Sequence, residues 1–247
     1  MKIAVVIAVY IENTDHLYFL KSTLASLKSQ HDLRVYIVEN YVNPVIRTKL
    51  DEVEIGTTVV QNSENIVSMA WNKGIVQALA DGASYVLVPN ADVILKSNCI
   101  DNLVAFAQAH PEHEMVTASE YVDLRTLEIE NEDDGVADSP HFSCFLVRPS
   151  FIKNTGGFDE NLKPAYREDQ DLHYRMRLLG LSAVSIGKAR FYHYGSRTIH
   201  TSNEPRVAEM KLGSGNTEAY YLRKWGGLAG HEIFKTPFNL GGSVKKW

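Results

Sequence analysis

Short continuous apolar runs alternate along the chain with segments of helical periodicity. Residues 2–10, rich in Val and Ile, are typical of a strand buried on both faces of a parallel sheet. Either Thr14 or Asp15 is positioned to cap the next helix, in which leucines recur at helical spacing over 17–27. Residues 33–38 then form a second strand, so the chain opens as strand, helix, strand.

The same alternation continues through the next 150 residues. It predicts an α/β domain with a Rossmann-like, mostly parallel central sheet flanked by helices. Ligands of such sheets bind at the carboxyl ends of the strands, and candidate chemistry is therefore sought there. Further strands are expected at 57–60, 85–88, 141–147 and 183–186, and further helices at 66–80, 100–109 and 168–179.

The chain after His193 changes character and becomes rich in Gly, Asn, Ser and aromatic residues. We predict that residues 201–247 form a helical and loop appendage packed on a catalytic domain of residues 1–200. The acidic stretch 128–138 lacks apolar periodicity and EF-hand spacing, and it is interpreted as a solvated loop.

The composition narrows the possible classes of protein. A chain of 247 residues suits one large α/β domain, and its net charge of -5 gives no global positive field toward nucleic acid. No apolar run approaches the roughly 20 residues that span a bilayer, so no integral membrane contact is expected. The start of the chain lacks signal-peptide features, which predicts a cytoplasmic location. Cys99 and Cys144 are expected to be reduced core residues.

One candidate site follows the predicted strand 85–88, where Asn90, Ala91 and Asp92 come in succession. A carboxylate just past a strand end projects into the ligand crevice, where it can hold a hard divalent ion that bridges a diphosphate. Asp92 is therefore a candidate metal ligand. A simple Asn-Ala-Asp turn explains the triplet about as well.

A second candidate is the acidic first turn of the predicted helix at 168–179. Carboxylates there complement the helix dipole, which is a purely structural explanation. Glu168 and Asp169 point in different directions around the helix, so that one can face an acceptor hydroxyl while the other orients it. Asp171 is expected to pair with a nearby arginine.

A third candidate is His193, just after the last predicted strand. It can complete the coordination sphere begun by Asp92, with Ser196 and Arg197 reaching diphosphate oxygens. A lone histidine is more often structural than a ligand, but its position after a strand end favours the site.

Several common enzyme classes lack their motifs here. Residues 213–218 contain Gly-Ser-Gly but miss the last glycine of a dinucleotide loop and follow no predicted strand. Walker-type, Gly-x-Ser-x-Gly and His-Glu-x-x-His motifs are missing from the sequence, which removes the ATPase, hydrolase and zinc-protease classes. Residues 8–16 also lack the Gly-rich basic loop of a nucleotidylyltransferase.

Taken together and in this order, the segments resemble family-2 glycosyltransferases of the GT-A fold, particularly the rhamnosyltransferase-like branch of bacteria and phages. The resemblance covers residues 1 to 200, and the order and spacing of its blocks make chance agreement improbable. These blocks are residues 5–10, 37–40, 65–75, 90–92, 156–160 and 168–172, followed by His193.

The resemblance implies a donor site in the first half of the chain. Ala8, Val9 and Tyr10 would line the pocket for the nucleotide base. Glu39 stands where the family usually has an aspartate that hydrogen-bonds a pyrimidine. Asn72 would lie near the diphosphate or the sugar.

It also implies the residues of the reaction itself. Asn90 replaces the first acid of the family's Asp-x-Asp motif and can still bond ribose hydroxyls, while Asp92 keeps the metal-binding carboxylate. His193 would be the second protein ligand to Mn²⁺ or Mg²⁺, with Arg197 as a helper at the diphosphate. Asp169 would be the general base.

The function that the resemblance implies is inverting, metal-dependent transfer of a sugar from a UDP- or dTDP-type donor to an acceptor hydroxyl of a saccharide or glycoconjugate. The aromatic residues of 220–225 would either close over the donor or pack as ordinary core. Two alternatives stay open: transfer to a modified DNA base, which the acidic charge balance disfavours, and a catalytically silent nucleotide-sugar-binding protein, against which the carboxylates and His193 argue.

Overall fold

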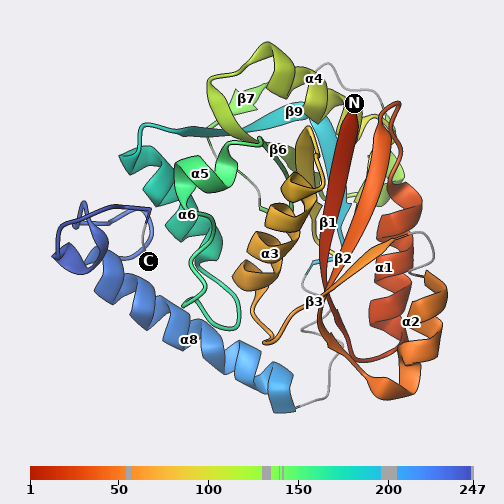
Figure 1. Ribbon diagram of the computed structural model, residues 1–247, viewed down its shortest axis with the longest axis horizontal. Coiled ribbons are helices and arrows are strands. Elements are labelled where there is room, and N and C mark those ends of the chain that lie inside the picture. The colour runs from red at the N-terminus through yellow and green to blue at the C-terminus, as the bar shows by residue number, and fades with distance from the viewer. Residues whose placement is uncertain (54–56, 130–134, 139, 141, 196–204, 246–247) are drawn as a thin grey trace.

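The computed structural model describes residues 1–247 except 54–56, 130–134, 139, 141, 196–204 and 246–247, and for residues 205–214 the backbone alone. A twisted central sheet runs through the molecule with helices on both faces (Figure 1). Its strands are β1 (Lys2–Ile11), β2 (Asp32–Val42), β3 (Thr58–Gln61), β4 (Tyr85–Pro89), β5 (Val93–Leu95), β6 (His113–Tyr121), β7 (Val136–Ala137), β8 (Cys144–Val147) and β9 (Ser182–His193).

The strands are ordered β3-β2-β1-β4-β8-β6-β9-β5, and β7 pairs with β9. Strands β3, β2, β1 and β4 are parallel to one another, whereas β8 enters antiparallel between β4 and β6. The predicted α/β class with a mostly parallel sheet is confirmed, because β6 and β9 resume the direction of the first four strands. Among the described strands, β8, β5 and β7 run against it. A fully buried strand has the same apolar pattern in either direction, so the pattern did not reveal this reversal.

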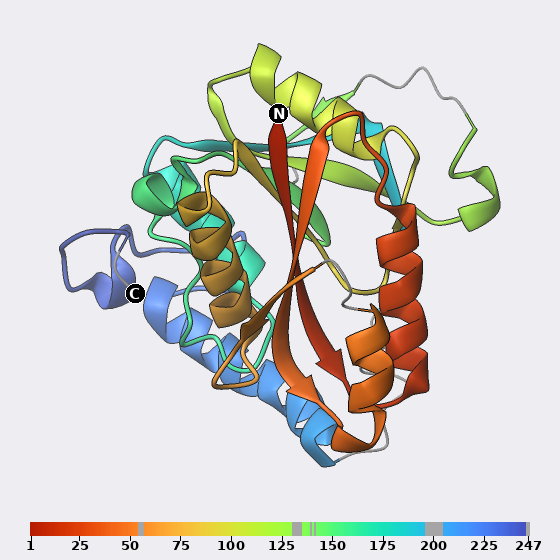
Figure 2. The same cartoon turned by 45° about the vertical axis from the view of Figure 1, so that its right-hand side comes forward.

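Helices cover the sheet on two sides. Figure 2 shows α1 and α3 on opposite faces of β1 and β2. Alternate residues of β1 divide between two buried clusters: Val5 and Ile7 pack with the face of α1, and Ala4 and Val6 pack with the face of α3. The helices are α1 (Thr14–Ser26), α2 (Arg47–Val53), α3 (Val67–Ala80), α4 (Cys99–Ala109), α5 (Phe151–Thr155), α6 (Glu168–Leu178) and α8 (Pro205–Trp225).

Helix α3 lies unusually close to the sheet at Gly74. A Cβ atom added there would be 2.3 Å from Val6 Cγ1 and 2.9 Å from a methyl group of Val38. Glycine is therefore required by packing in the middle of this helix, although it weakens the helix itself. This close approach sets the distance between α3 and strands β1 and β2.

Some local details differ from the sequence prediction. The cap of α1 is Asn13, whose Oδ1 accepts hydrogen bonds from the backbone N–H of Asp15 and His16, each at 3.0 Å. Strands β5, β6 and β7 were not predicted, and β7 lies in the acidic stretch that was interpreted as a loop, where it pairs with β9. Cys99 and Cys144 are buried free thiols, as expected. Part of the acidic stretch, residues 130–134, lies outside the described residues.

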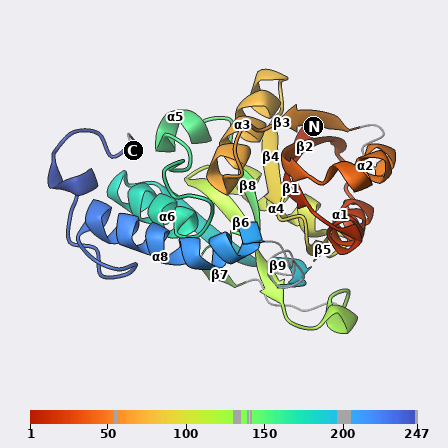
Figure 3. The ribbon, with the colours of Figure 1, turned by 90° about the horizontal axis from the view of Figure 1, so that it is seen from below.

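The C-terminal segment begins with the 21-residue helix α8, which lies beside α6 (Figure 3). Trp225 is fully buried and its ring meets the Tyr174 ring of α6 edge-on at 4.9 Å between centroids. The aromatic residue therefore packs against a helix, and the division at residue 200 stays a prediction. Among the described helices, none combines the length and apolar character needed to cross a membrane.

Candidate functional site

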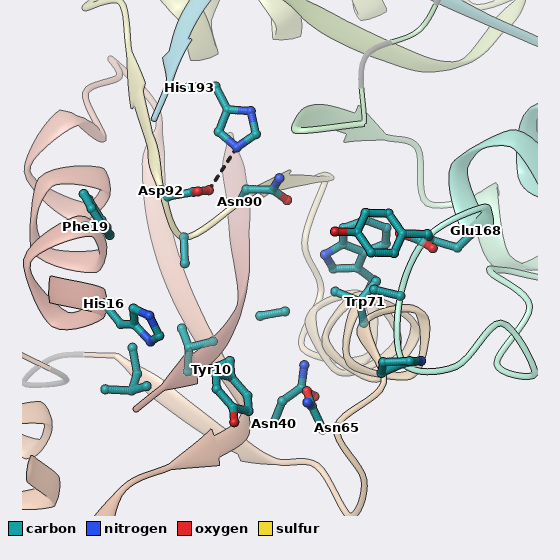
Figure 4. A pocket seen from close by; sticks show the side chains of 18 residues that line it. Tyr10, His16, Phe19, Asn40, Asn65, Trp71, Asn90, Asp92, Glu168 and His193 are labelled. Atoms are coloured by element: carbon teal, nitrogen blue, oxygen red, sulfur yellow. Dashed lines mark hydrogen bonds and ion pairs between the residues drawn. The ribbon is translucent and has the colours of Figure 1, made fainter. Parts of the chain in front are cut away.

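A cavity of about 220 Å³ opens where β1 and β4 end, between α1, α3 and the segment that leads into α6 (Figure 4). It lies at the carboxyl ends of parallel strands, where ligands of α/β sheets bind. Candidate site residues from distant parts of the sequence line this cavity together. These are Ala8, Val9, Tyr10, Asn90, Asp92, Glu168 and His193.

Asp92 and His193 meet on one side of the cavity. Strand β5 pairs with the end of β9, with Val93 opposite His193, and this pairing brings residues 101 positions apart into contact. Asp92 Oδ1 and His193 Nε2 are 3.1 Å apart, shown by the dashed line in Figure 4. Glu120, near the end of β6, lies behind them, with its carboxylate 3.9 Å from His193 Nδ1.

The electrostatics of this pair favour a positive charge. Burial alone would lower the pKa of His193, but the hydrogen bond and charge of Asp92, together with the charge of Glu120, outweigh it and raise the pKa. A carboxylate oxygen and an imidazole nitrogen that face each other at a pocket wall also suit a divalent cation, which would take the place of the shared proton. The carboxylate oxygen suits Mg²⁺ and Mn²⁺, and the imidazole nitrogen is a common ligand of first-row transition ions.

Glu168, in the first turn of α6, lies across the cavity from Asp92 and His193 (Figure 4), and Tyr166 also lines the wall. Glu168 is 8% exposed, and within the described part of the chain nothing hydrogen-bonds its Oε2. Burial, with the neighbouring charge of Asp169, raises the pKa of Glu168 to about 8. This carboxyl group is therefore largely protonated at neutral pH.

A second cavity, of about 400 Å³, adjoins the first and lies between α6 and α8. Tyr166 and Glu168 line both cavities, whereas Asp169 lines only the second. Burial also raises the pKa of Asp169, although a hydrogen bond from the Gln170 backbone N–H at 2.8 Å opposes the shift. Glu218 of α8 closes the far side and pairs with Arg167.

Asp171, three residues after Glu168 in α6, belongs to a buried network. Its pairing with an arginine is confirmed, since Arg175 Nε donates to Asp171 Oδ2 at 2.7 Å. Lys224 and Trp225 of α8 donate to the other oxygen at 2.6 and 2.8 Å. The helix that carries Glu168 and Asp169 is therefore tied to the C-terminal helix α8 through Asp171.

Two residues selected for donor binding lie outside the wall of the first cavity. The Glu39 carboxylate accepts from Arg47 Nη1 and Gln61 Nε2, both at 2.5 Å, while the next residue, Asn40, faces the cavity. The Asn72 side chain holds the turn at Phe158, accepting from its N–H and donating to its carbonyl oxygen, each at 2.8 Å. These contacts occupy polar atoms that were expected to meet the donor.

Arg197, with Ser196, lies outside the described residues. Other wall residues were not selected from the sequence, among them His16 and Phe19 of α1 and Tyr166 before α6. The two residues of α1 sit on a helix face whose apolar spacing is indistinguishable from that of ordinary core. Tyr166 has a left-handed φ of 79°, a feature that the sequence does not reveal.

Comparison with known proteins settles the family. The family model described as Glycosyl transferase family 2 matches residues 4–155, the part of the chain that carries β1 to β8 and the Asp92 turn. The chain belongs to glycosyl transferase family 2. The resemblance to family-2 glycosyltransferases that was inferred from its motifs is thereby confirmed.

One curated relative of this family-2 enzyme is a galactofuranosyl glycosyltransferase of Leishmania donovani, 24% identical over an alignment that covers 80% of this chain and 55% of the relative. The chain thus spans about half the length of that protein.

Two solved structures share the fold at 14% identity, each over 90% of this chain. S. aureus TarS 1–349 has a TM-score of 0.59 with 73% of its chain covered, and GalNAc-T7 with UDP, GalNAc and Mn²⁺ has a TM-score of 0.63 with 50% covered. Both similarities confirm the GT-A fold.

Proposed function

We propose that this enzyme is an inverting, metal-dependent glycosyltransferase that moves a sugar from a UDP- or dTDP-type donor to a hydroxyl of a saccharide or glycoconjugate. The observation that carries the proposal is the first cavity, with the Asp92–His193 pair on one side and Glu168 on the other. Sugar transfer brings a donor diphosphate and an acceptor hydroxyl together, and the cavity offers the Asp92–His193 pair for the diphosphate and the Glu168 side for the acceptor.

The nucleotide is assigned to the end of β1. Ala8, Val9 and Tyr10 line this part of the cavity, and Tyr10 is held by stacking on Tyr41 with 4.9 Å between ring centroids. We assign the polar contact with the base to Asn40, because the Glu39 carboxylate is already bonded twice. Structures of TarS with UDP-GlcNAc and of GalNAc-T7 with UDP support a uridine nucleotide.

Asp92 and His193 would hold Mn²⁺ or Mg²⁺, which neutralises charge on the leaving diphosphate when bound. Asn90, beside them on the wall, is assigned to the ribose hydroxyls. Arg197 is proposed to assist at the diphosphate.

The second cavity is assigned to the acceptor, and Asp169 to the general base. A single in-line displacement needs a base on the side away from the leaving group, and Asp169 lines the cavity away from Asp92. Glu168, protonated near pH 7, is suited to donate a hydrogen bond that orients the acceptor where the cavities join. The segment 201–247 contributes Glu218 to this cavity as an appendage on the catalytic domain.

The proposal is tested by thermal shift with a panel of UDP- and dTDP-sugars, in Mn²⁺ and in EDTA, followed by assay of nucleoside diphosphate release. A donor should raise the melting temperature by mass action, and more so with Mn²⁺. Binding without turnover toward saccharides would favour the silent sugar-binding alternative, and turnover only with DNA would reassign the acceptor. If no nucleotide-sugar shifted the melting temperature, the donor site would be wrong.

A further inference from the structure

We propose that His110, Glu112 and His113 form a second metal site, for a divalent transition ion of the Zn²⁺ class. The three residues lie between the end of α4 and the start of β6, and none of them lines the nucleotide-sugar cavity. Two imidazoles and one carboxylate form a ligand set that suits zinc, with a remaining position for water.

The three side chains already converge. His110 Nδ1 is 3.1 Å from Glu112 Oε1, and His113 Nε2 is 3.7 Å from the same oxygen. One ligand atom from each residue lies within 4.8 Å of the other two. Bonds of about 2.0 Å to a tetrahedral ion place its ligand atoms about 3.3 Å apart, so only small side-chain adjustments are needed.

A hydrogen bond on the second ring nitrogen orients the imidazole of His113. Its Nδ1 lies 2.8 Å from Ser182 Oγ, at the start of the neighbouring strand β9. With Nδ1–H donating to that hydroxyl, Nε2 carries the lone pair of the ring, 3.7 Å from the Glu112 carboxylate. A hydrogen bond on the far ring nitrogen is what fixes the tautomer and direction of histidines that bind metal.

The backbone and the other ring are held as well. Arg148 donates from Nε to the His113 carbonyl at 2.6 Å and from Nη2 to the His110 carbonyl at 2.9 Å, which ties the two ends of the turn together. Phe106 of α4 stacks on His110 with 4.2 Å between ring centroids. An ion would therefore meet two imidazole rings that have lost much of their freedom before it binds.

The site is remote from the chemistry. His113 begins β6, whereas Glu120, which contacts His193, lies near the end of the same nine-residue strand. At roughly 3.3 Å per residue, the separation along the strand is on the order of 20 Å. An ion at His113 cannot contact the donor, so its occupancy is expected to change stability and not to supply the catalytic ion.

The test is a calorimetric titration of the tag-free full chain with Zn²⁺, in a background carrying Asp92→Asn to remove the carboxylate of the active site. One ion should bind, and His110→Ala or Glu112→Gln should weaken it by at least about tenfold. Ser182→Ala, which keeps all three ligands, should weaken it by about tenfold through the lost orienting bond. His231→Ala, at an exposed histidine outside the cluster, is the matched control.

Melting temperatures give a second readout. Zn²⁺ should raise the melting temperature of the background protein and of His231→Ala, and fail to do so for His110→Ala, while Mg²⁺ has no effect at the same concentration. Zn²⁺ binding that is unchanged in both His110→Ala and Glu112→Gln would overturn the proposal. The side chains of His110 and Glu112 are 44% and 59% exposed, so these variants are expected to fold.

Discussion

Lys224 Nζ lies 2.6 Å from Asp171 Oδ1, and both side chains are inaccessible to solvent. The same ammonium group donates to Asp159 Oδ2 at 2.6 Å. Arg175 completes the network on Asp171, so two buried cations serve two buried carboxylates. The network joins α8 to α6, the helix whose first turn carries Glu168.

Replacing Lys224 by methionine should therefore cost about 3–5 kcal/mol of unfolding free energy, because it leaves buried carboxylate charge without its partner. Urea unfolding followed by circular dichroism measures this. The control is Lys163→Met, which breaks a half-exposed pair with Glu64 at 3.1 Å and should cost no more than about 1 kcal/mol. Equal losses in the two variants would mean that the buried network does not hold α8 in place.

The network also marks a limit of what the sequence could predict. The aromatic stretch around Trp225 was recognised as distinctive from the sequence. The two carboxylates that Lys224 contacts, Asp159 and Asp171, lie 65 and 53 residues earlier in the chain. Local periodicity carries no information on such pairs. Strands β1 and β4 were predictable because their apolar runs are unbroken.

The same contrast holds within the site. The meeting of Asp92 and His193 could be predicted because Asp92 comes just after β4 and His193 is the last residue of β9. The carboxyl ends of parallel strands gather at one edge of a sheet. Glu39 and Asn72 could not be placed, because the direction of a side chain depends on neighbours such as Arg47 and Phe158. The apolar pattern of the sequence predicts where a strand ends. The hydrogen-bond partners of a side chain depend on how the folded chain packs around it.

Gly74→Ala should destabilise the protein by about 1–3 kcal/mol, although alanine is the better helix former. The new methyl group would lie 2.3 Å from Val6 Cγ1, in a part of the core that has no room for it. Gly215→Ala in α8 is the matched control, since nothing lies within 4 Å of the added carbon, and it should stabilise by up to about 1 kcal/mol. Urea midpoints compare the two. A stabilised Gly74→Ala would show that α3 is not pressed against β1.

The raised pKa of Glu168 predicts a pH dependence of stability. Its pKa rises from 4.5 to about 8 on folding, so the native state keeps a proton that the unfolded chain releases. The stability from this group is fully present below pH 4.5 and is lost as the pH rises to 8. Glu168→Gln cannot titrate, and its unfolding free energy relative to wild type should therefore increase between pH 5 and pH 8.5. Urea denaturation at both pH values tests this, and a constant difference would contradict it.

Asp92→Asn should remove the benefit of the metal ion to nucleotide binding. The amide keeps the size of the side chain, but it lacks the charge that holds a divalent ion beside His193. Calorimetry with UDP should show tighter binding in Mn²⁺ than in EDTA for the wild type, and equal binding for the variant. If wild-type affinity were the same in Mn²⁺ and EDTA, the proposed ion bridge would be wrong.

Asp169→Asn should lower sugar transfer by roughly 10² or more, the scale expected for a lost general base, while donor binding and folding stay near normal. Of the two cavities, Asp169 lines only the second, which is proposed for the acceptor, so the amide of the variant cannot disturb the proposed nucleotide site directly. Glu168→Gln should be milder, because a protonated carboxyl and an amide can both donate a hydrogen bond. Turnover is measured with saturating donor, and donor affinity by calorimetry. If Asp169→Asn kept near-normal turnover while Glu168→Gln was inactive, the base would be reassigned to Glu168. If both variants unfolded, the acidic turn would be a structural element of α6 and the catalytic assignment would be wrong.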